Sequence, residues 1–137
     1  MPKIEIVPEH VPVSHTAKCT VLHVNGFVDA PNYDAFTAAI QKAVKGGDKY
    51  LVIDMASVAY INSTGISALI KWQGTLAEAG GALVLAHVPR TVAVSLDLLG
   101  LTTVVPLAVD VAKAQELLRG VAAGSLPPGG LARAAAS

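Results

Sequence analysis

Three consecutive polar residues, Asn62, Ser63 and Thr64, carry the clearest chemistry in this sequence. They precede Gly65 and a stretch in which apolar residues recur at helical spacing. Side chains of these types cap the starts of helices, where unpaired N–H groups and the positive end of the helix dipole favour an anion. A hydroxyl held there is suited to carry a phosphate group. Residue type alone also allows a plainer role for Ser63, that of a helix cap.

The elements that position this polar segment are predicted from the pattern of apolar residues. Before it, Leu51–Ile53 is a short apolar, β-branched run, which is typical of a strand buried on both faces, and Asp54 ends that strand. After it, the period becomes that of a helix with one apolar stripe, made of Ile66, Leu69, Ile70, Leu76 and Ala77. The polar segment is therefore a junction between a strand and a helix.

The residues around this junction resemble those of the STAS domain family, the fold of bacterial anti-sigma-factor antagonists. The mark of that family is a strand ending in Asp, a short Ser-x-Val segment, an apolar pair, and then Asp-Ser-Ser-Gly opening a helix. The corresponding segments here are Ile53-Asp54, Ser57 to Ala59 around Val58, Tyr60-Ile61, and Asn62 to Gly65.

Further matches lie on both sides of the junction. Gly26-Phe27-Val28-Asp29 resembles the Gly-x-x-Asp that precedes the family's first helix. Pro89 to Leu101 resembles its third helix and the Gly-Leu turn after it, so the resemblance covers roughly residues 3 to 118. It implies an α/β fold, with a small and mostly parallel sheet of about four or five strands and about four helices.

The family's regulatory chemistry falls on Ser63, which aligns with the serine that is phosphorylated in the family; Thr64 is a weaker candidate. Asp29 corresponds to an acid inside the partner's footprint, and a helix-capping role for it is about equally consistent with the sequence. Asn62 stands where the family usually has Asp, so an acid that would help to orient the hydroxyl is missing. This departure bears on phosphorylation and much less on partner binding.

The predicted partner-binding surface consists of Asp29, Asn62, Ser63, Thr64, Gly65 and Trp72. Trp72 falls roughly opposite the apolar stripe of its helix, so we expect it to be partly exposed. Exposed tryptophans are enriched at interface hot spots, although single surface aromatics are also common. For Asp54 we expect a structural role, in which the carboxylate bonds backbone amides or a nearby hydroxyl.

Composition argues against several classes of function. Ten basic and ten acidic residues cancel and form no basic stripe, so nucleic-acid binding has no electrostatic driving force. No apolar run approaches the roughly 20 residues that span a bilayer, and the N-terminus lacks the long apolar segment of a signal peptide. Cys19 is the only cysteine, which fits a reducing compartment. We therefore expect a cytoplasmic domain that is not embedded in a membrane.

Signatures of enzymes and metal sites are missing from the sequence. It has no Gly-rich phosphate loop followed by Lys and no Gly-x-Ser-x-Gly elbow. His10, His15, His23 and His87 lie on separate segments without an acid cluster nearby, so no metal site is expected. We also expect no cofactor and no enzymatic activity.

The rest of the chain alternates between strand and helix patterns, which favours one mostly parallel sheet with helical cover. The remaining predicted strands are Ile4 to Val7 ended by Pro8, Thr20–Val24, Ala82–Ala86 and Thr103–Val105. The remaining predicted helices are Tyr33 to Val44, Pro89 to Leu99, and Asp110 to Leu118, with Asp110 as a cap. We assign residues 1–120 to one domain and residues 121–137 to a flexible tail rich in Ala, Pro and Gly.

These observations favour a regulatory protein-binding domain. In that hypothesis, a serine kinase that is also an anti-sigma factor binds the start of the Ser63 helix and the Asp29 loop, and phosphorylation of Ser63 lowers its affinity. The alternative is a STAS scaffold, an assembly subunit of a signalling complex or transport system that works without phosphorylation. Both hypotheses leave open a homodimer or a larger assembly. An enzyme on the same sheet is the least favoured, because no nucleophile–base pair is evident.

Overall fold

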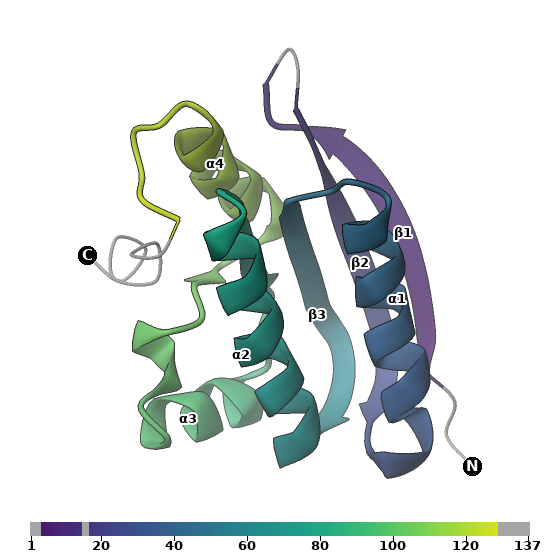
Figure 1. Cartoon of the computed structure of the whole chain (residues 1–137). Helices are drawn as coiled ribbons and strands as arrows, with labels where there is room; N and C mark the ends of the chain where they lie inside the picture. The colour runs from purple at the N-terminus through teal and green to yellow at the C-terminus, as the bar shows by residue number, and fades with distance from the viewer. Residues whose placement is uncertain (1–3, 15–16, 129–137) are drawn as a thin grey trace.

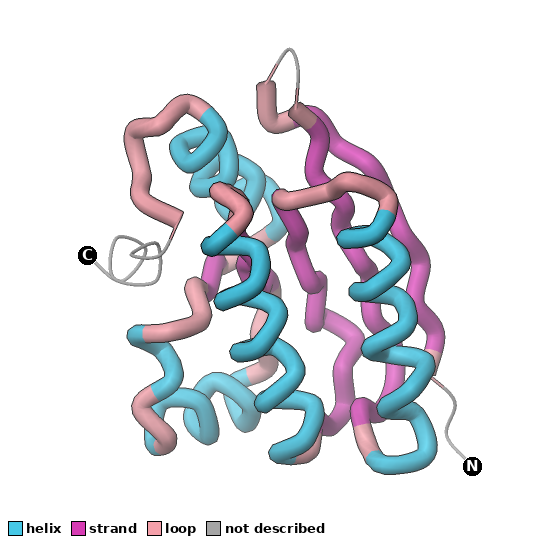
Figure 2. Tube along the Cα trace, viewed as in Figure 1, coloured by secondary structure: helices cyan, strands magenta, loops and turns pink. Residues whose placement is uncertain are grey.

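The computed structural model describes residues 4–14 and 17–128 of the chain. Its elements, in order, are β1 (Glu5–Pro12), β2 (Lys18–Val28), the 3-10 turn η1 (Ala30–Asn32), α1 (Tyr33–Lys45), β3 (Tyr50–Ile61), α2 (Ser63–Glu78), β4 (Ala82–Ala86), α3 (Arg90–Leu98), the 3-10 turn η2 (Leu101–Thr103), β5 (Leu107–Ala108) and α4 (Val111–Ala122). Figures 1 and 2 show how strands and helices alternate after the first two strands.

The strands form a single sheet in the order β1-β2-β3-β4-β5. β1 pairs with β2 antiparallel, and all other neighbours are parallel. The helices α1, α2 and α3 pack on one face of the sheet and α4 packs on the other; Figure 1 shows α1 and α2 lying along the sheet as neighbours. The predicted class, a small and mostly parallel α/β sheet covered by helices, is confirmed.

Alternation along the central strands divides the core between the two faces. In β4, Leu83 and Leu85 belong to the cluster beneath α1, α2 and α3, whereas Ala82, Val84 and Ala86 belong to the cluster beneath α4. All of them are buried, as expected for a parallel strand that is covered on both sides. The prediction of a buried strand at Ala82–Ala86 is therefore confirmed.

The first strand is longer than predicted. Pro8 does not end it, because β1 continues to Pro12 and places Pro8 opposite Leu22 of β2. Proline is tolerated at this position because β1 is the edge strand, whose outer side has no neighbour to receive an N–H bond.

β2 and β3 also extend beyond their predicted ends. β3 does not end at Asp54 but reaches Ile61, and β2 passes Gly26 to reach Val28. The added segments pair with each other in parallel, with register shifts after His23 and after Gly26. Gly26 has a φ of 116°, which side-chain-bearing residues rarely adopt. Because β4 pairs with β3 only as far as Asp54, the two longer strands project past the rest of the sheet.

The predicted strand at Thr103–Val105 is wrong. Gly100 adopts a left-handed φ of 72° and leads into η2, after which the backbone N–H of Val105 donates to the carbonyl oxygen of Leu101 at 2.9 Å. The buried apolar side chain of Val105 thus comes from a compact turn, and the strand that pairs with β4 is Leu107–Ala108. Leu99, the last residue of the predicted third helix, lies just after the end of α3 and is exposed.

At the C-terminal end, α4 begins as predicted, since Asp110 caps it by accepting a 2.7 Å hydrogen bond from the backbone N–H of Lys113. The helix continues to Ala122, so the first residues assigned to the tail belong to α4, and Val121 is buried. Residues 129–137, which make up about half of the predicted tail, lie outside the described residues, as does His15.

Candidate functional site

The ends of β2 and β3 bring the two halves of the predicted site together. Val28 and Ile61 are paired neighbours in the parallel sheet, and Asp29 and Asn62 are the residues that follow them. The backbone N–H of Asn62 donates a 2.9 Å hydrogen bond to the carbonyl oxygen of Val28. In open parallel sheets, binding sites form at the carboxyl ends of the strands. The Asp29 loop and the start of α2 therefore lie at one edge of the molecule.

Asn62 is the N-cap of α2. Its backbone is extended, and its side-chain Oδ1 accepts a 2.8 Å hydrogen bond from the backbone N–H of Gly65. Its own carbonyl oxygen accepts the first bond of the helix, from Ile66, at 3.0 Å. The substitution of Asn for the family's usual Asp thus preserves capping geometry and removes one negative charge from the helix start.

The first turn of α2 presents unpaired donors. In the described part of the chain, the backbone N–H groups of Ser63 and Thr64 have no protein acceptor, whereas those of Asn62 and Gly65 are bonded. The first turn contains no acidic residue. Two N–H groups and the positive end of the helix dipole therefore face any anion that approaches this point.

Gly65 explains how closely α2 approaches the sheet. A Cβ atom added at Gly65 would lie 2.7 Å from Cγ1 of Val28 and 2.9 Å from Cγ1 of Ile61. These distances are shorter than real contacts allow, so a side chain at this position would have to displace the helix or the side chains of Val28 and Ile61. Gly65, which was predicted to be part of the partner-binding surface, is buried. It allows the first turn of α2 to pack closely against the ends of β2 and β3.

Ser63 and Thr64 are both exposed at the start of α2. At the same end of α2 lies a pocket of about 220 Å³, whose lining includes Tyr60, Ile66 and Thr91 but neither Ser63 nor Thr64. The pocket joins the end of β3, the first turn of α2 and the helix α3. The two hydroxyl groups and this pocket therefore lie at the same end of α2, and a partner's side chain can enter the pocket.

Sequence reasoning missed the contribution of α3 and its surroundings to this edge. Tyr60, at the end of β3, is 49% exposed, and Leu98, at the end of α3, is 82% exposed. Other exposed apolar side chains of this region are Val94, Leu99 and Val104. The adjacent pair Leu98-Leu99 was a usable signal, because a helix cannot bury both neighbours on one narrow stripe.

Asp29 occupies the N-cap position of η1, but its side chain does not cap the backbone. Instead, its Oδ1 accepts a 2.9 Å hydrogen bond from Nδ2 of Asn32, which also donates to the carbonyl oxygen of Phe27 at 3.0 Å. The capping prediction for this carboxylate is wrong. The Asn32 amide holds the Asp29 carboxylate in place beside the start of α2.

Trp72 is half-buried in the middle of α2 and packs against the core with Ile70. The ammonium of Lys71 lies 5.3 Å from the centroid of its ring. The expectation of partial exposure is confirmed. Trp72 lies more than two helical turns from Ser63, so it belongs to the flank of α2 and not to its start.

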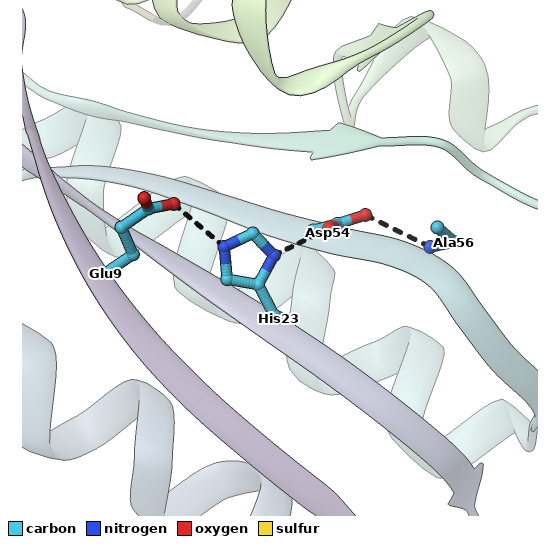
Figure 3. Close-up of polar contacts among 4 residues, drawn as sticks. All are labelled: Glu9, His23, Asp54 and Ala56. Atoms are coloured by element: carbon cyan, nitrogen blue, oxygen red, sulfur yellow. Dashed lines mark hydrogen bonds and ion pairs between the residues drawn. The ribbon is translucent and has the colours of Figure 1, made fainter.

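Asp54 has the structural role that was predicted for it, with an unpredicted partner. Its Oδ1 accepts a 3.1 Å hydrogen bond from the backbone N–H of Ala56, and its Oδ2 lies 2.7 Å from Nδ1 of His23. The other ring nitrogen of His23 lies 2.9 Å from Oε1 of Glu9, so the imidazole sits between two carboxylates (Figure 3). The prediction that the histidines lack acidic neighbours is therefore wrong for His23.

The His23 cluster joins three neighbouring strands, because Glu9 belongs to β1, His23 to β2 and Asp54 to β3. The hydrogen bond to Glu9 and the interactions with Asp54 raise the pKa of His23, against the opposing effect of desolvation. By alternation along β3, Asp54 projects to the same face as Val52, which is the face that α4 covers. The cluster is thus on the face opposite α2.

Within residues 4–14 and 17–128, no three His, Cys, Asp or Glu side chains are placed to hold a metal ion. None of the helices in these segments is both long and apolar enough to cross a bilayer.

A family profile described as "Mlab, STAS domain" matches residues 11–107, which is more than half of the chain and contains the whole start of α2. The chain belongs to the STAS domain family. The family resemblance read from the residue pattern is confirmed. No match to this STAS domain was found among curated proteins.

Solved structures share the architecture of this STAS domain. An anti-sigma factor antagonist from Mycobacterium paratuberculosis is 24% identical, with a TM-score of 0.71 over 85% of this chain and 94% of that chain. The anti-sigma factor antagonist SpoIIAA, a Bacillus protein, is 18% identical in its unphosphorylated form, with a TM-score of 0.67 over 85% of this chain and 97% of that chain. A sulfate transporter family protein from Wolinella succinogenes is 18% identical, with a TM-score of 0.60 over 77% and 88%. At these identities the similarity establishes the fold.

Proposed function

We propose that this STAS domain is a cytoplasmic regulatory protein of the anti-sigma-factor-antagonist kind. It acts by binding a protein partner, a serine kinase that is also an anti-sigma factor, and not by catalysing a reaction. The binding surface is the start of α2 together with the Asp29 loop, and phosphorylation of Ser63 switches it off.

The observation that carries this proposal is the exposed hydroxyl of Ser63 at the first position of α2, beside two unbonded N–H groups. A phosphate on this oxygen adds about two negative charges at the positive end of the helix dipole. No acidic residue of the first turn opposes this phosphate, and the carboxylate of Asp29 is the nearby negative charge that the helix dipole and the two N–H groups have to outweigh. The fold therefore stays the same while the surface that the partner meets changes in charge and bulk.

The residues around Ser63 form the rest of the proposed partner-binding surface. The partner meets the fixed carboxylate of Asp29 on one side and the apolar side chains of Tyr60 and α3 on the other. The pocket beside Tyr60 and Thr91 suits an apolar side chain of the partner as an anchor. Thr64 is the second exposed hydroxyl of this turn and a weaker acceptor for phosphate. Trp72 would lie at the margin of such an interface.

Two relatives in fold support this assignment. SpoIIAA, a Bacillus anti-sigma factor antagonist, has been solved in unphosphorylated and phosphorylated forms, so that protein carries a phosphate. The Mycobacterium paratuberculosis protein is likewise an anti-sigma factor antagonist. In this chain, Asn62 keeps the capping geometry of the site without a carboxylate, so the kinase must orient the Ser63 hydroxyl with groups of its own.

The test is phosphorylation by a purified serine kinase of the anti-sigma type from the same organism, with ATP and Mg²⁺, followed by intact mass. We expect the mass of one phosphate to be added to the wild-type chain and to the Ser67→Ala control, and not to Ser63→Ala. Ser67 is a suitable control because it is another exposed serine, one turn further along α2. Equal labelling of Ser63→Ala and wild type would refute phosphorylation at this site.

A second candidate function is that of a scaffold subunit. The structural similarity to a sulfate transporter family protein favours it, since that protein shares the fold. A scaffold would form a stable complex whose size on gel filtration does not change when Ser63 is replaced by Asp. A switch would lose its partner under the same substitution, so one experiment separates the two candidates.

A further inference from the structure

A second hollow lies far from Ser63, between the edge strand β1 and the C-terminal half of α1. Its volume is about 510 Å³, and it is partly open to solvent. Ile6 and Pro8 of β1 and Leu22 of β2 form its floor, and α1 forms its wall. A volume of this size falls within the range of small-molecule sites, which hold about 300–1,000 Å³.

The hollow exists because α1 carries small residues where it faces β1. Ala39, Ala43 and Gly46 line it at spacings of four and three, whereas Phe36 and Ile40 pack into the main core. A row of large side chains at these positions would have filled the space between helix and edge strand. The sequence thus builds a groove with apolar walls in place of a packed contact.

A chain of hydrogen bonds forms the polar end of the hollow. The hydroxyl of Thr20, whose side chain is buried, donates to Oδ2 of Asp48, and its oxygen lies 3.2 Å from Nδ1 of His10. A hydroxyl has one proton and a carboxylate can only accept, so Nδ1 of His10 must be the donor to Thr20. In neutral His10 the other ring nitrogen, Nε2, is then an acceptor.

Apart from the exposed Lys42, the groups that remain available at this end are therefore acceptors, and Asp48 brings a negative charge. Asp48 carries a carboxylate, and its backbone N–H bonds the carbonyl oxygen of Ala43 in the last turn of α1, at the negative end of that helix dipole. An anion is disfavoured here by both features. A ligand must instead offer hydrogen-bond donors with positive charge, joined to an apolar body that fits against Ala39 and Ala43.

We propose that this hollow is a binding site for a small apolar primary amine, whose ammonium group bonds Asp48 and His10 while its hydrocarbon part lies against α1. Lys42, an exposed residue that also lines the hollow, carries an ammonium that would compete with an incoming amine for the Asp48 carboxylate. The site is at the opposite end of α1 from the Asp29 loop, so it does not depend on the switch at Ser63.

The test uses 2-phenylethylamine and, as a control of similar size and opposite charge, 3-phenylpropanoate. Each is titrated into the ¹⁵N-labelled full chain while amide resonances are recorded. We expect the amine to shift the amides of Thr20, Leu22, Ala43 and Gly46 in a saturable way, and the acid to leave them in place. Failure of the amine to saturate these amides, or equal shifts with the acid, overturns the proposal.

Two substitutions test whether the amine binds at the polar end of the hollow. Asp48→Asn, which can still accept the bond from Thr20, is expected to weaken amine binding roughly tenfold or more through the loss of a charge-assisted bond. Lys42→Met should strengthen it, because the competing ammonium is gone; weaker binding in Lys42→Met contradicts the proposed charge pattern.

A filling variant tests the hollow itself. Ala43→Leu should abolish binding by occupying the apolar part, whereas Ala38→Leu, at an exposed position of the same helix, should bind like wild type. Binding that survives Ala43→Leu unchanged places the amine elsewhere and overturns the proposal.

Discussion

The backbone N–H of Asn62 donates a 2.9 Å hydrogen bond to the carbonyl oxygen of Val28, which extends the pairing of β2 and β3 past Val28 and Ile61. This pairing makes Asp29, which precedes η1, a neighbour of Asn62, which caps α2, although the two residues are far apart in the sequence. The exposed hydroxyl of Ser63 and the carboxylate of Asp29 share one edge for this reason.

The close packing of α2 against the sheet predicts opposite changes in stability when each of its two glycines is replaced by alanine. Gly65→Ala should lower the free energy of unfolding by about 1–3 kcal/mol, because the new Cβ overlaps Val28 and Ile61. Gly74→Ala on the same helix, where nothing lies within 4 Å, should instead raise it by up to about 1 kcal/mol. Urea denaturation of both variants measures the difference. A stabilised Gly65→Ala would mean that the helix start is not seated as described.

The cap of α2 gives a second prediction. Asn62→Ala removes the acceptor for the Gly65 N–H and should cost about 0.5–2 kcal/mol of unfolding free energy. Asn62→Asp keeps the acceptor and adds a charge that the helix dipole favours, so its stability should equal or exceed that of wild type. Thermal denaturation of the three proteins checks the order. Equal stability of Asn62→Ala and wild type would show that the cap contributes nothing.

Much of this site was predictable, because local residue types decide it. A run of Asn, Ser and Thr between a buried strand and an amphipathic helix is a local pattern, and it predicted the junction correctly. The bond from Asn32 to Asp29 and the position of Tyr60 depend on how two strands extend together past β4. No local pattern reports such pairing, so these parts could not be read from the sequence.

His23 gives a prediction on pH. Its pKa is raised by the hydrogen bond to Glu9 and by Asp54, so the folded state binds the proton more tightly than the unfolded chain does. The resulting stability is fully present below the unfolded pKa of about 6.5 and is lost as the pH rises through the higher folded value. The effect is modest, because the His23 side chain is 38% exposed.

The measurement is the free energy of unfolding of wild type and His23→Gln at about pH 6 and about pH 8.5. Wild type should lose more stability between the two values than the variant, since other titrating groups are common to both. An identical change in the two proteins would show that His23 keeps the same proton affinity in both states.

Cys19 should be unreactive while the protein is folded. The side chain is 0% exposed, and burial, with a smaller contribution from Asp48, raises the pKa of its thiol to about 12. The thiolate that reacts with alkylating reagents is therefore almost absent at neutral pH. We expect iodoacetamide to label the chain in urea and to leave the native protein unlabelled over the same period. Equal labelling in both conditions would contradict the burial of Cys19.

The spacing of apolar residues was enough to predict the fold class, and the errors in the predicted strands share one cause. Predicted strands ended at Pro8 and Asp54 because those residues are poor in strand interiors, yet an edge position and a paired neighbour accommodate both. Val105 looked like part of a strand because it is β-branched and apolar, while its burial comes from a compact turn. In each case a tertiary contact overrode a local preference.

The central claim is that added charge at Ser63 alters partner binding without altering the fold. Its most direct test measures, by calorimetry, the affinity of the purified kinase partner for wild type, for Ser63→Asp and for the matched control Ser67→Asp. Circular dichroism spectra of the three proteins show whether the fold has changed. We expect unchanged spectra, at least roughly tenfold weaker binding for Ser63→Asp, and an affinity within about twofold of wild type for Ser67→Asp. Equal affinity of Ser63→Asp and wild type would contradict the switch.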